Sequence, residues 1–104
     1  MRIAVASTGK HENTLVSPVS GRAEYYLLFE GKKLIKAIKN PFKIGGGGAG
    51  LSVAQMLANE RVELVISGKF GANMQTMLES KNIKIKIENN KTIKEIIEEV
   101  TKEI

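Results

Sequence analysis

The chain has 104 residues, a net charge of +5 at pH 7, and hydrophobic and charged shares of 42% and 26%, which together predict one soluble globular domain over residues 1–104. It contains no cysteine and no aspartate, so disulfides, thiol catalysis, zinc ribbons and cysteine-ligated iron–sulfur clusters are excluded. Because the chain has a single histidine, it also lacks the ligands for an ordinary zinc or non-haem iron site.

The positive charge comes mainly from lysine. It suits an anionic partner such as a phosphate compound, a nucleic acid or an anionic cofactor. The combination of lysine, glutamate and isoleucine is also typical of a heat-adapted protein, and this alternative stays open. No apolar stretch is long enough to cross a bilayer and no signal peptide is evident after Arg2, so we expect a cytoplasmic protein without a membrane partner.

The first part of the chain predicts three strands and a long loop. Residues 2–6 are β-branched and apolar, which predicts a buried strand that ends at the polar turn 7–9. Residues 10–23 have no periodicity, and a loop of this length is more often functional than idle. Residues 24–30 and 33–39 read as strands separated by a glycine–lysine pair, which suits a hairpin.

A glycine run at residues 45–50 precedes a predicted helix at 51–60. Glycine lets backbone amides turn toward a bound group, and the first amides of a helix lack partners, so the run is a candidate anion cradle. A mobile loop is the competing interpretation. The helix is expected to bury one face, formed by Leu51, Ala54, Leu57 and Ala58.

A short apolar run at residues 62–66 follows the first helix and predicts a central parallel strand. The next helix carries Met74, Met77 and Leu78 at helical spacing, and we expect the methionines to pack in the core. Asn82 is a suitable left-handed residue at which this helix stops.

The end of the chain predicts one more strand and one more helix. Isoleucine alternates with charged residues over 83–88, which indicates a strand with one wet face near the edge of the sheet. Thr92 and Glu95 form a capping-box pattern at the start of the last helix. Its apolar stripe, which should dock on the sheet, consists of Ile93, Ile96, Ile97, Val100 and Ile104.

This order of elements predicts an α/β fold, a three-layer α/β/α sandwich around a five-stranded mixed sheet. Ligands of such sheets gather at the carboxyl ends of parallel strands, where we expect the turns 7–9, 45–50 and 67–71 to converge. The architecture also suggests ribonuclease H, whose nucleases need clustered carboxylates for two metal ions. The central strand offers only Glu63, so a nuclease is excluded for want of ligands.

The glycine run does not identify a nucleotide site. Gly45, Gly47 and Gly50 satisfy the dinucleotide pattern G-x-G-x-x-G, but no buried strand precedes them. Leu51 and Ser52 occupy the positions at which a P-loop needs lysine and then serine or threonine. We therefore assign neither a dinucleotide nor a nucleoside triphosphate on this pattern.

Three side chains near the predicted turns are candidates for contact with an anionic guest. His11 could act as a metal ligand or hydrogen-bond donor, although an exposed bystander is the simpler interpretation. Arg22 has a forked guanidinium that can bind an anion at two points. Lys69 follows Gly68 at the end of the central strand and would act as a point charge.

Taken together, several segments resemble the dinitrogenase iron-molybdenum cofactor biosynthesis family, which includes NifX-like proteins and the C-terminal domain of some NifB proteins. The resemblance covers nearly the whole chain, and the order and spacing of its segments make it specific. The segments are MRIAVAS at Met1–Ser7, VSPVSGRA at Val16–Ala23, Asn40–Pro41, GAGLSVAQMLANE at Gly48–Glu60 and VELVISGKFGAN at Val62–Asn73.

The resemblance implies a ribonuclease H-like architecture and a role as a carrier rather than an enzyme. Members associated with nitrogenase bind iron–sulfur or iron-molybdenum cofactor precursors. These precursors are anionic and already contain their sulfide ligands. Such a guest suits a positive, glycine-lined pocket in a chain without cysteine. Val19 stands where many members have a histidine, so His11 of the same loop is the remaining candidate for a metal ligand.

These observations lead to three hypotheses. The first is a non-enzymatic carrier of an iron–sulfur or iron-molybdenum type cofactor, which would pass it to a protein acceptor. The second is a regulatory domain that binds a small anion or nucleotide without metal. The third is an interaction module for a protein or nucleic acid, ranked last because no aromatic stacking platform is evident. The expected cofactor-binding residues are Ser7, Thr8, Gly9, His11, Arg22, Gly47, Gly48, Gly50, Gly68 and Lys69.

Overall fold

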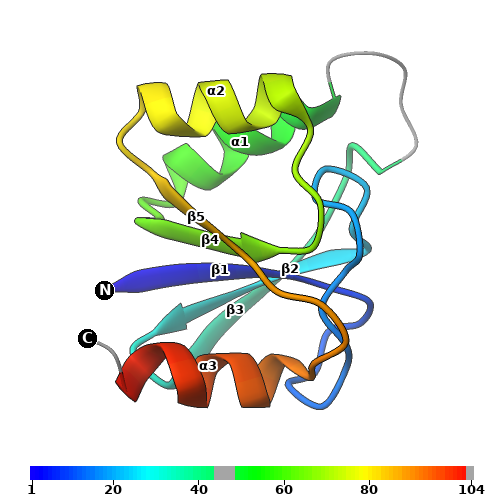
Figure 1. Cartoon of the computed structure of the whole chain (residues 1–104), viewed down its shortest axis with the longest axis vertical. Coiled ribbons are helices and arrows are strands. Elements are labelled where there is room, and N and C mark those ends of the chain that lie inside the picture. Colours follow the sequence, from blue (N-terminus) through cyan, green and yellow to red (C-terminus); the bar gives the residue numbers. More distant parts are fainter. Residues whose placement is uncertain (44–48, 103–104) are drawn as a thin grey trace.

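The computed structural model describes residues 1–43 and 49–102 and contains the predicted strands and helices in the predicted order. The strands form one mixed sheet in the order β3-β2-β1-β4-β5, in which β1 pairs antiparallel with β2 and parallel with β4 (Figure 1). The elements are β1 (Arg2–Ser7), β2 (Tyr25–Glu30), β3 (Lys33–Lys39), α1 (Ala49–Asn59), β4 (Leu64–Ser67), α2 (Ala72–Ser80), β5 (Lys84–Ile87) and α3 (Ile93–Lys102).

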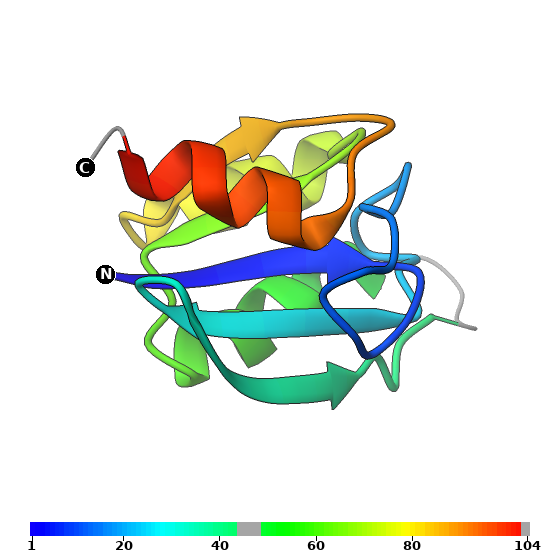
Figure 2. The same ribbon diagram turned by 90° about the horizontal axis from the view of Figure 1, so that it is seen from below.

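The helices cover both faces of this sheet, so the predicted three-layer sandwich is confirmed. α1 and α2 lie on one face and α3 on the other (Figures 1 and 2). Two separate apolar clusters fill the layers. Tyr26 and Leu28 of β2 pack toward α1 and α2, whereas Leu27 and Phe29 pack toward α3, as the alternation of side chains along a strand requires. The comparison with ribonuclease H stays a prediction.

Local signals in the second half of the chain act as predicted. Asn82 follows the C-cap residue Lys81 of α2 and has a φ of +61°, the left-handed conformation that ends a helix at low cost for asparagine. β5 is an edge strand that pairs parallel with β4 and leaves Ile87 60% exposed. Met74 is almost completely buried and Met77 packs at the margin of the same cluster, which confirms the core role predicted for them.

The predicted buried face of α1 is partly wrong. The helix begins at Ala49, two residues earlier than predicted, and buries Val53, Ala54 and Leu57. Leu51 is 38% exposed. The reason is that Val53, Ala54 and Leu57 pack into the cluster shared by the sheet and α2, so the buried stripe includes Val53 and leaves Leu51 beside an open hollow.

The capping box of α3 is present and gives a pH-dependent contribution to stability. The Glu95 carboxylate accepts hydrogen bonds from the Thr92 amide at 3.0 Å and the Thr92 hydroxyl at 2.9 Å. These bonds, the amide first, hold the pKa of Glu95 below its ordinary value. A lowered pKa means that the stabilisation is present above the ordinary pKa of glutamate and is lost as the pH falls through the lowered one.

We therefore expect Glu95→Ala to reduce the urea midpoint of unfolding near neutral pH and to have a smaller effect in acid. The measurement is the difference in midpoint between the natural protein and the variant from about pH 7 to about pH 3, which spans the titration of carboxylates. Glu98→Ala removes an exposed carboxylate of the same helix outside the cap and is the control. A difference for Glu95→Ala that stays constant with pH would contradict the role of the ionised cap.

Candidate functional site

A hollow of about 430 Å³ lies where the starts of α1 and α2 meet the loop that precedes β2. It opens at the end of the molecule where β4 finishes, the edge at which α/β sheets usually bind ligands. We call it the helix-start hollow. Its lining residues are Val19, Ser20, Gly21, Arg22, Ala49, Gly50, Leu51, Lys69, Gly71, Ala72, Asn73 and Met74.

The wall of the helix-start hollow is built by two backbone segments that lie side by side. The amide of Gly68 donates to the Ser17 carbonyl at 2.9 Å, and the amide of Lys69 donates to the Pro18 carbonyl at 2.7 Å. The amide of Ser20 returns a bond of 2.8 Å to the Lys69 carbonyl. These bonds extend the strand pairing beyond β4 and carry Lys69 to the rim of the hollow.

Gly68 is required by this arrangement for steric reasons. A Cβ atom at this position would lie 2.3 Å from the Pro18 carbonyl oxygen and 2.6 Å from its carbon. Real Cβ contacts are essentially never this short, and both neighbours are backbone atoms that cannot rotate away. Gly68 therefore supports the site by letting two segments of the chain, residues 17–18 and 68–69, approach each other. It does not line the hollow.

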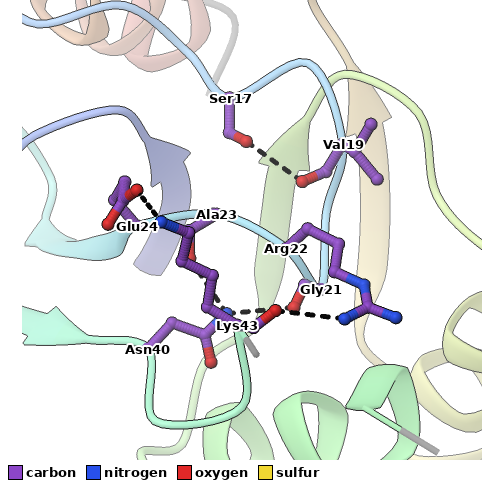
Figure 3. A network of polar contacts seen from close by, with 8 residues as sticks. All are labelled: Ser17, Val19, Gly21, Arg22, Ala23, Glu24, Asn40 and Lys43. Atoms are coloured by element: carbon purple, nitrogen blue, oxygen red, sulfur yellow. Dashed lines mark hydrogen bonds and ion pairs between the residues drawn. The ribbon is translucent and has the colours of Figure 1, made fainter. Parts of the chain in front are cut away.

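The peptide of Gly21 is held from both sides by buried polar side chains. The Tyr26 hydroxyl accepts a hydrogen bond from the Gly21 amide at 2.8 Å and contacts the Ser20 hydroxyl at 3.0 Å. The Asn40 side-chain amide donates to the Gly21 and Ala23 carbonyls, each at 3.0 Å (Figure 3). Burial is the main cause that raises the pKa of Tyr26, so its hydroxyl stays protonated at neutral pH.

The hydrogen bonds that Tyr26 and Asn40 make with Gly21, which we call the Gly21 clamp, place Arg22 at the rim of the hollow. Its side chain is exposed, and Nη1 donates to the Lys43 carbonyl at 3.0 Å (Figure 3). Lys43 in turn forms an ion pair with Glu24. Gly21 has a φ of +91°, a conformation that glycine adopts without strain, and this turn allows the clamped peptide to be followed directly by an outward-pointing arginine.

The electrostatic character of the helix-start hollow favours an anion. Arg22 and Lys69 supply positive charge from two different loops, and no acidic side chain lines the hollow among the described residues. α2 begins after Gly71 without a side-chain cap. The uncapped first turn of a helix carries free amides and the positive end of the helix dipole.

One part of the hollow is apolar. Val19 and Leu51 line it and are 40% and 38% exposed. Met74 also contributes to its wall, and a Cβ atom on Gly50 would lie only 3.0 Å from the Met74 Cβ. Gly50 thus lets α1 and α2 approach closely at their starts. The sequence indicated Leu51 and Met74 only as core residues, and no local signal distinguished them as lining residues.

The structure brings only some of the predicted site residues together. Arg22, Gly50 and Lys69 line the helix-start hollow, while Gly68 stands behind its wall. The predicted residues Gly47 and Gly48 lie outside the described residues.

The first turn of the chain lies elsewhere. Ser7 is completely buried and its hydroxyl donates to the Gly9 carbonyl. The loop that contains Thr8 and His11 is tied to the start of α3, because the Lys94 amide donates to the Glu12 carbonyl at 2.9 Å. α3 covers the sheet face opposite to α1 and α2 (Figure 1). The expected convergence of turn 7–9 with residues 67–71 and with Gly50 is therefore not observed, because none of the residues of this turn lines the hollow.

The donor groups decide which kind of guest fits. Among residues 1–43 and 49–102, no three histidine, cysteine or acidic side chains are grouped so that they could hold a metal ion. The hollow instead offers two cations, helix-start amides and apolar surface. A bare metal ion does not fit this set, whereas an anion that carries its own complete set of ligands does.

None of the helices within the described ranges has the length and apolar character needed to cross a membrane.

Comparison with known proteins places the fold among solved structures. The apo form of the orange protein from Desulfovibrio gigas is 24% identical with a TM-score of 0.91, and the match covers 98% of this chain and 88% of that one. This likeness is one of fold.

A candidate NifB protein from Thermotoga, which belongs to the DUF35 family, is 26% identical with a TM-score of 0.83, and the match covers 97% of this chain and 87% of that one. No curated protein matches the chain significantly. The model of the family described as dinitrogenase iron-molybdenum cofactor matches residues 1–103, which confirms the resemblance drawn from the sequence. The chain belongs to the dinitrogenase iron-molybdenum cofactor family.

Proposed function

We propose that this protein is a non-enzymatic carrier of a preassembled, anionic metal–sulfur cofactor or precursor of the iron–sulfur or iron-molybdenum type. The observation that carries the proposal is the approach of Arg22 and Lys69 to the uncapped start of α2, around a hollow without acidic lining residues in the described chain. Membership in a family described by the iron-molybdenum cofactor supports the class of guest. A protein acceptor of the cofactor is part of the proposal.

The chemistry of the hollow suits sulfide better than a strongly hydrated anion. Sulfide ligands on a cluster are polarisable and weakly hydrated, so they lose little when they contact apolar side chains such as Val19 and Leu51. The negative charge of the cluster is balanced by Arg22, Lys69 and the amides of α2. The guest brings its own metal ligands, so binding needs shape and charge rather than coordination by the protein.

The test incubates the purified chain under anaerobic conditions with an iron–sulfur cluster that has been reconstituted beforehand from ferrous iron and sulfide. After removal of unbound material, retained iron and visible absorption are measured for the natural protein and for the double variant Arg22→Ala/Lys69→Ala. Charged hydrogen bonds contribute about 1.5–3 kcal/mol each, so the variant should bind at least about tenfold more weakly.

A matched control removes the same amount of charge far from the hollow. Lys84→Ala/Lys94→Ala changes two exposed residues, on β5 and on α3, and should leave iron retention unchanged. The carrier proposal is wrong if the natural protein retains no iron, or if the two double variants lose iron equally. His11→Ala is a further comparison, and because His11 lies outside the hollow we expect no loss of iron.

A second candidate function is the binding of a small anion or nucleotide without metal. It is favoured by Arg22, Lys69 and the uncapped start of α2, since these cations and amides would also bind phosphate. A ligand that binds only the folded state raises the melting temperature. Stabilisation by phosphate compounds, without retention of iron, would support this alternative over the carrier.

A further inference from the structure

A second feature, independent of the helix-start hollow, is the outer edge of β3. This strand closes one side of the sheet and pairs only with β2 among the described residues, so its other side presents unpaired backbone amides and carbonyls. β3 and the turn before it carry Lys32, Lys33, Lys36 and Lys39 and no acidic residue. The edge is therefore a positively charged template for another strand.

A hollow of about 510 Å³ lies beside this edge, between α1 and the turn after β3. Phe42 and Met56 give it an apolar wall, and Ser52 and Asn59 of α1 border it. Glu60 lines the same hollow and forms an ion pair with Lys36 at 2.9 Å. This ion pair makes the edge of β3 and the hollow neighbours, so a single extended segment can reach both.

We propose that the β3 edge and this adjacent hollow bind an extended, acidic segment of a partner protein by strand addition. The main chain of the segment pairs with β3. Its acidic side chains meet Lys39, which shares the α3 face of the sheet with Tyr25, and one apolar side chain on the other face enters the hollow beside Phe42 and Met56. Main-chain pairing supplies the affinity in this mode of binding, and the charges and the pocket supply the specificity.

Charge decides between an acidic partner and a second copy of this chain. Two β3 edges paired with each other would place lysines of both copies close together, and like charges across a strand pair are destabilising. Lysines on an edge strand prevent pairing with another copy for this reason. The same lysines select a strand of the opposite charge.

The opposite edge of the sheet is a poorer site. β5 has four residues, whereas β3 has seven, so β5 offers fewer backbone groups with which an added strand could pair. The hollow beside β5 is lined by Glu79, Asn82, Ile83, Lys84 and Ile85, and these lining residues include no aromatic or methionine side chain like Phe42 and Met56, which form the apolar wall beside β3. β5 therefore provides an internal comparison for the experiment.

The test begins with selection of binders to the full chain from a random library of peptides of about nine residues, the length of an ordinary strand. We expect the selected peptides to contain glutamate or aspartate in alternation with apolar residues. Bound to isotopically labelled protein, they should slow amide hydrogen exchange along β3 and shift the methyl signal of Met56.

Two matched variants then separate a strand site from general charge attraction. Lys39→Glu reverses an exposed charge on β3, and Lys84→Glu makes the same change on β5. Lys39→Glu should weaken binding of the selected peptide about fivefold and Lys84→Glu should not, since a surface charge pair contributes up to about 1 kcal/mol. Failure to select acidic peptides, protection away from β3, equal effects of the two variants, or dimerisation through β3 would overturn the proposal.

Discussion

Replacing Gly68 with alanine should lower the free energy of unfolding by about 2–4 kcal/mol, because the new methyl group overlaps backbone and separates two hydrogen-bonded segments. The methyl carbon would lie 2.3 Å from the Pro18 carbonyl oxygen. To relieve this contact, the chain must lengthen the bonds from Gly68 to Ser17 and from Lys69 to Pro18, now 2.9 and 2.7 Å. Urea denaturation of the natural protein and the variant measures the loss.

Gly71→Ala is the matched control for Gly68→Ala. Gly71 also lies near the helix-start hollow, but a Cβ atom there would meet nothing within 4 Å, and its φ of −70° is open to any residue. We expect its free energy of unfolding to change by less than about 0.5 kcal/mol. Equal losses in the two variants would contradict the steric role of Gly68. Since Gly68→Ala displaces Lys69, it should also reduce retention of iron in the carrier experiment.

The fold was predictable because its signals are local and repeated. The apolar run of β2, the turn at Gly31 with its φ of +58°, and the stop at Asn82 each depend on residues near one another in the chain. The capping box of Thr92 and Glu95 is equally local. These signals agree with one another, so the order of elements and the three layers could be derived from the sequence.

The composition of the candidate site was less predictable, because it depends on contacts between distant segments. The sequence indicated Arg22 in the long loop and Lys69 at the end of the central strand as separate cations, and hydrogen bonds between residues 17–20 and 68–69 bring them to one hollow. Leu51 has the spacing of a core residue and faces this hollow instead, because α2 packs against α1.

The long loop before β2 is a second case in which contacts between distant segments, which the sequence does not reveal, decide where the residues lie. Its first part, with His11, follows the start of α3, while its second part, with Arg22, reaches the starts of α1 and α2. The division occurs at residues 15–17, where the Val16 amide donates to the Lys91 carbonyl and the Ser17 amide to the Ala6 carbonyl. No periodic or turn signal in the sequence marks this division, so residues close in sequence were assigned to one site.

Removal of the Asn40 side chain should have an effect as large as Gly68→Ala. Asn40 is 4% exposed, and its side chain satisfies three backbone groups: the Gly21 carbonyl, the Ala23 carbonyl and the Phe42 amide, at 3.0, 3.0 and 2.9 Å. Asn40→Ala leaves these groups without their partner in a buried place. Because one unsatisfied buried group costs about 1–3 kcal/mol, and relaxation admits water to some of them, we expect a loss of about 3 kcal/mol.

Urea denaturation of Asn40→Ala is compared with that of Asn59→Ala, since Asn59 is exposed and its side chain accepts a hydrogen bond from Gln55. The control should change the free energy of unfolding by less than about 0.5 kcal/mol. Asn40→Asp adds a test of direction: its carboxylate keeps an acceptor for Phe42 but faces two carbonyl oxygens. Burial and these oxygens should raise the pKa of the new carboxyl, so the destabilisation should shrink as the pH falls and the group becomes a donor. A loss independent of pH would show that the Asn40 amide is not needed as a donor to Gly21, and the Gly21 clamp would then be only a packing contact.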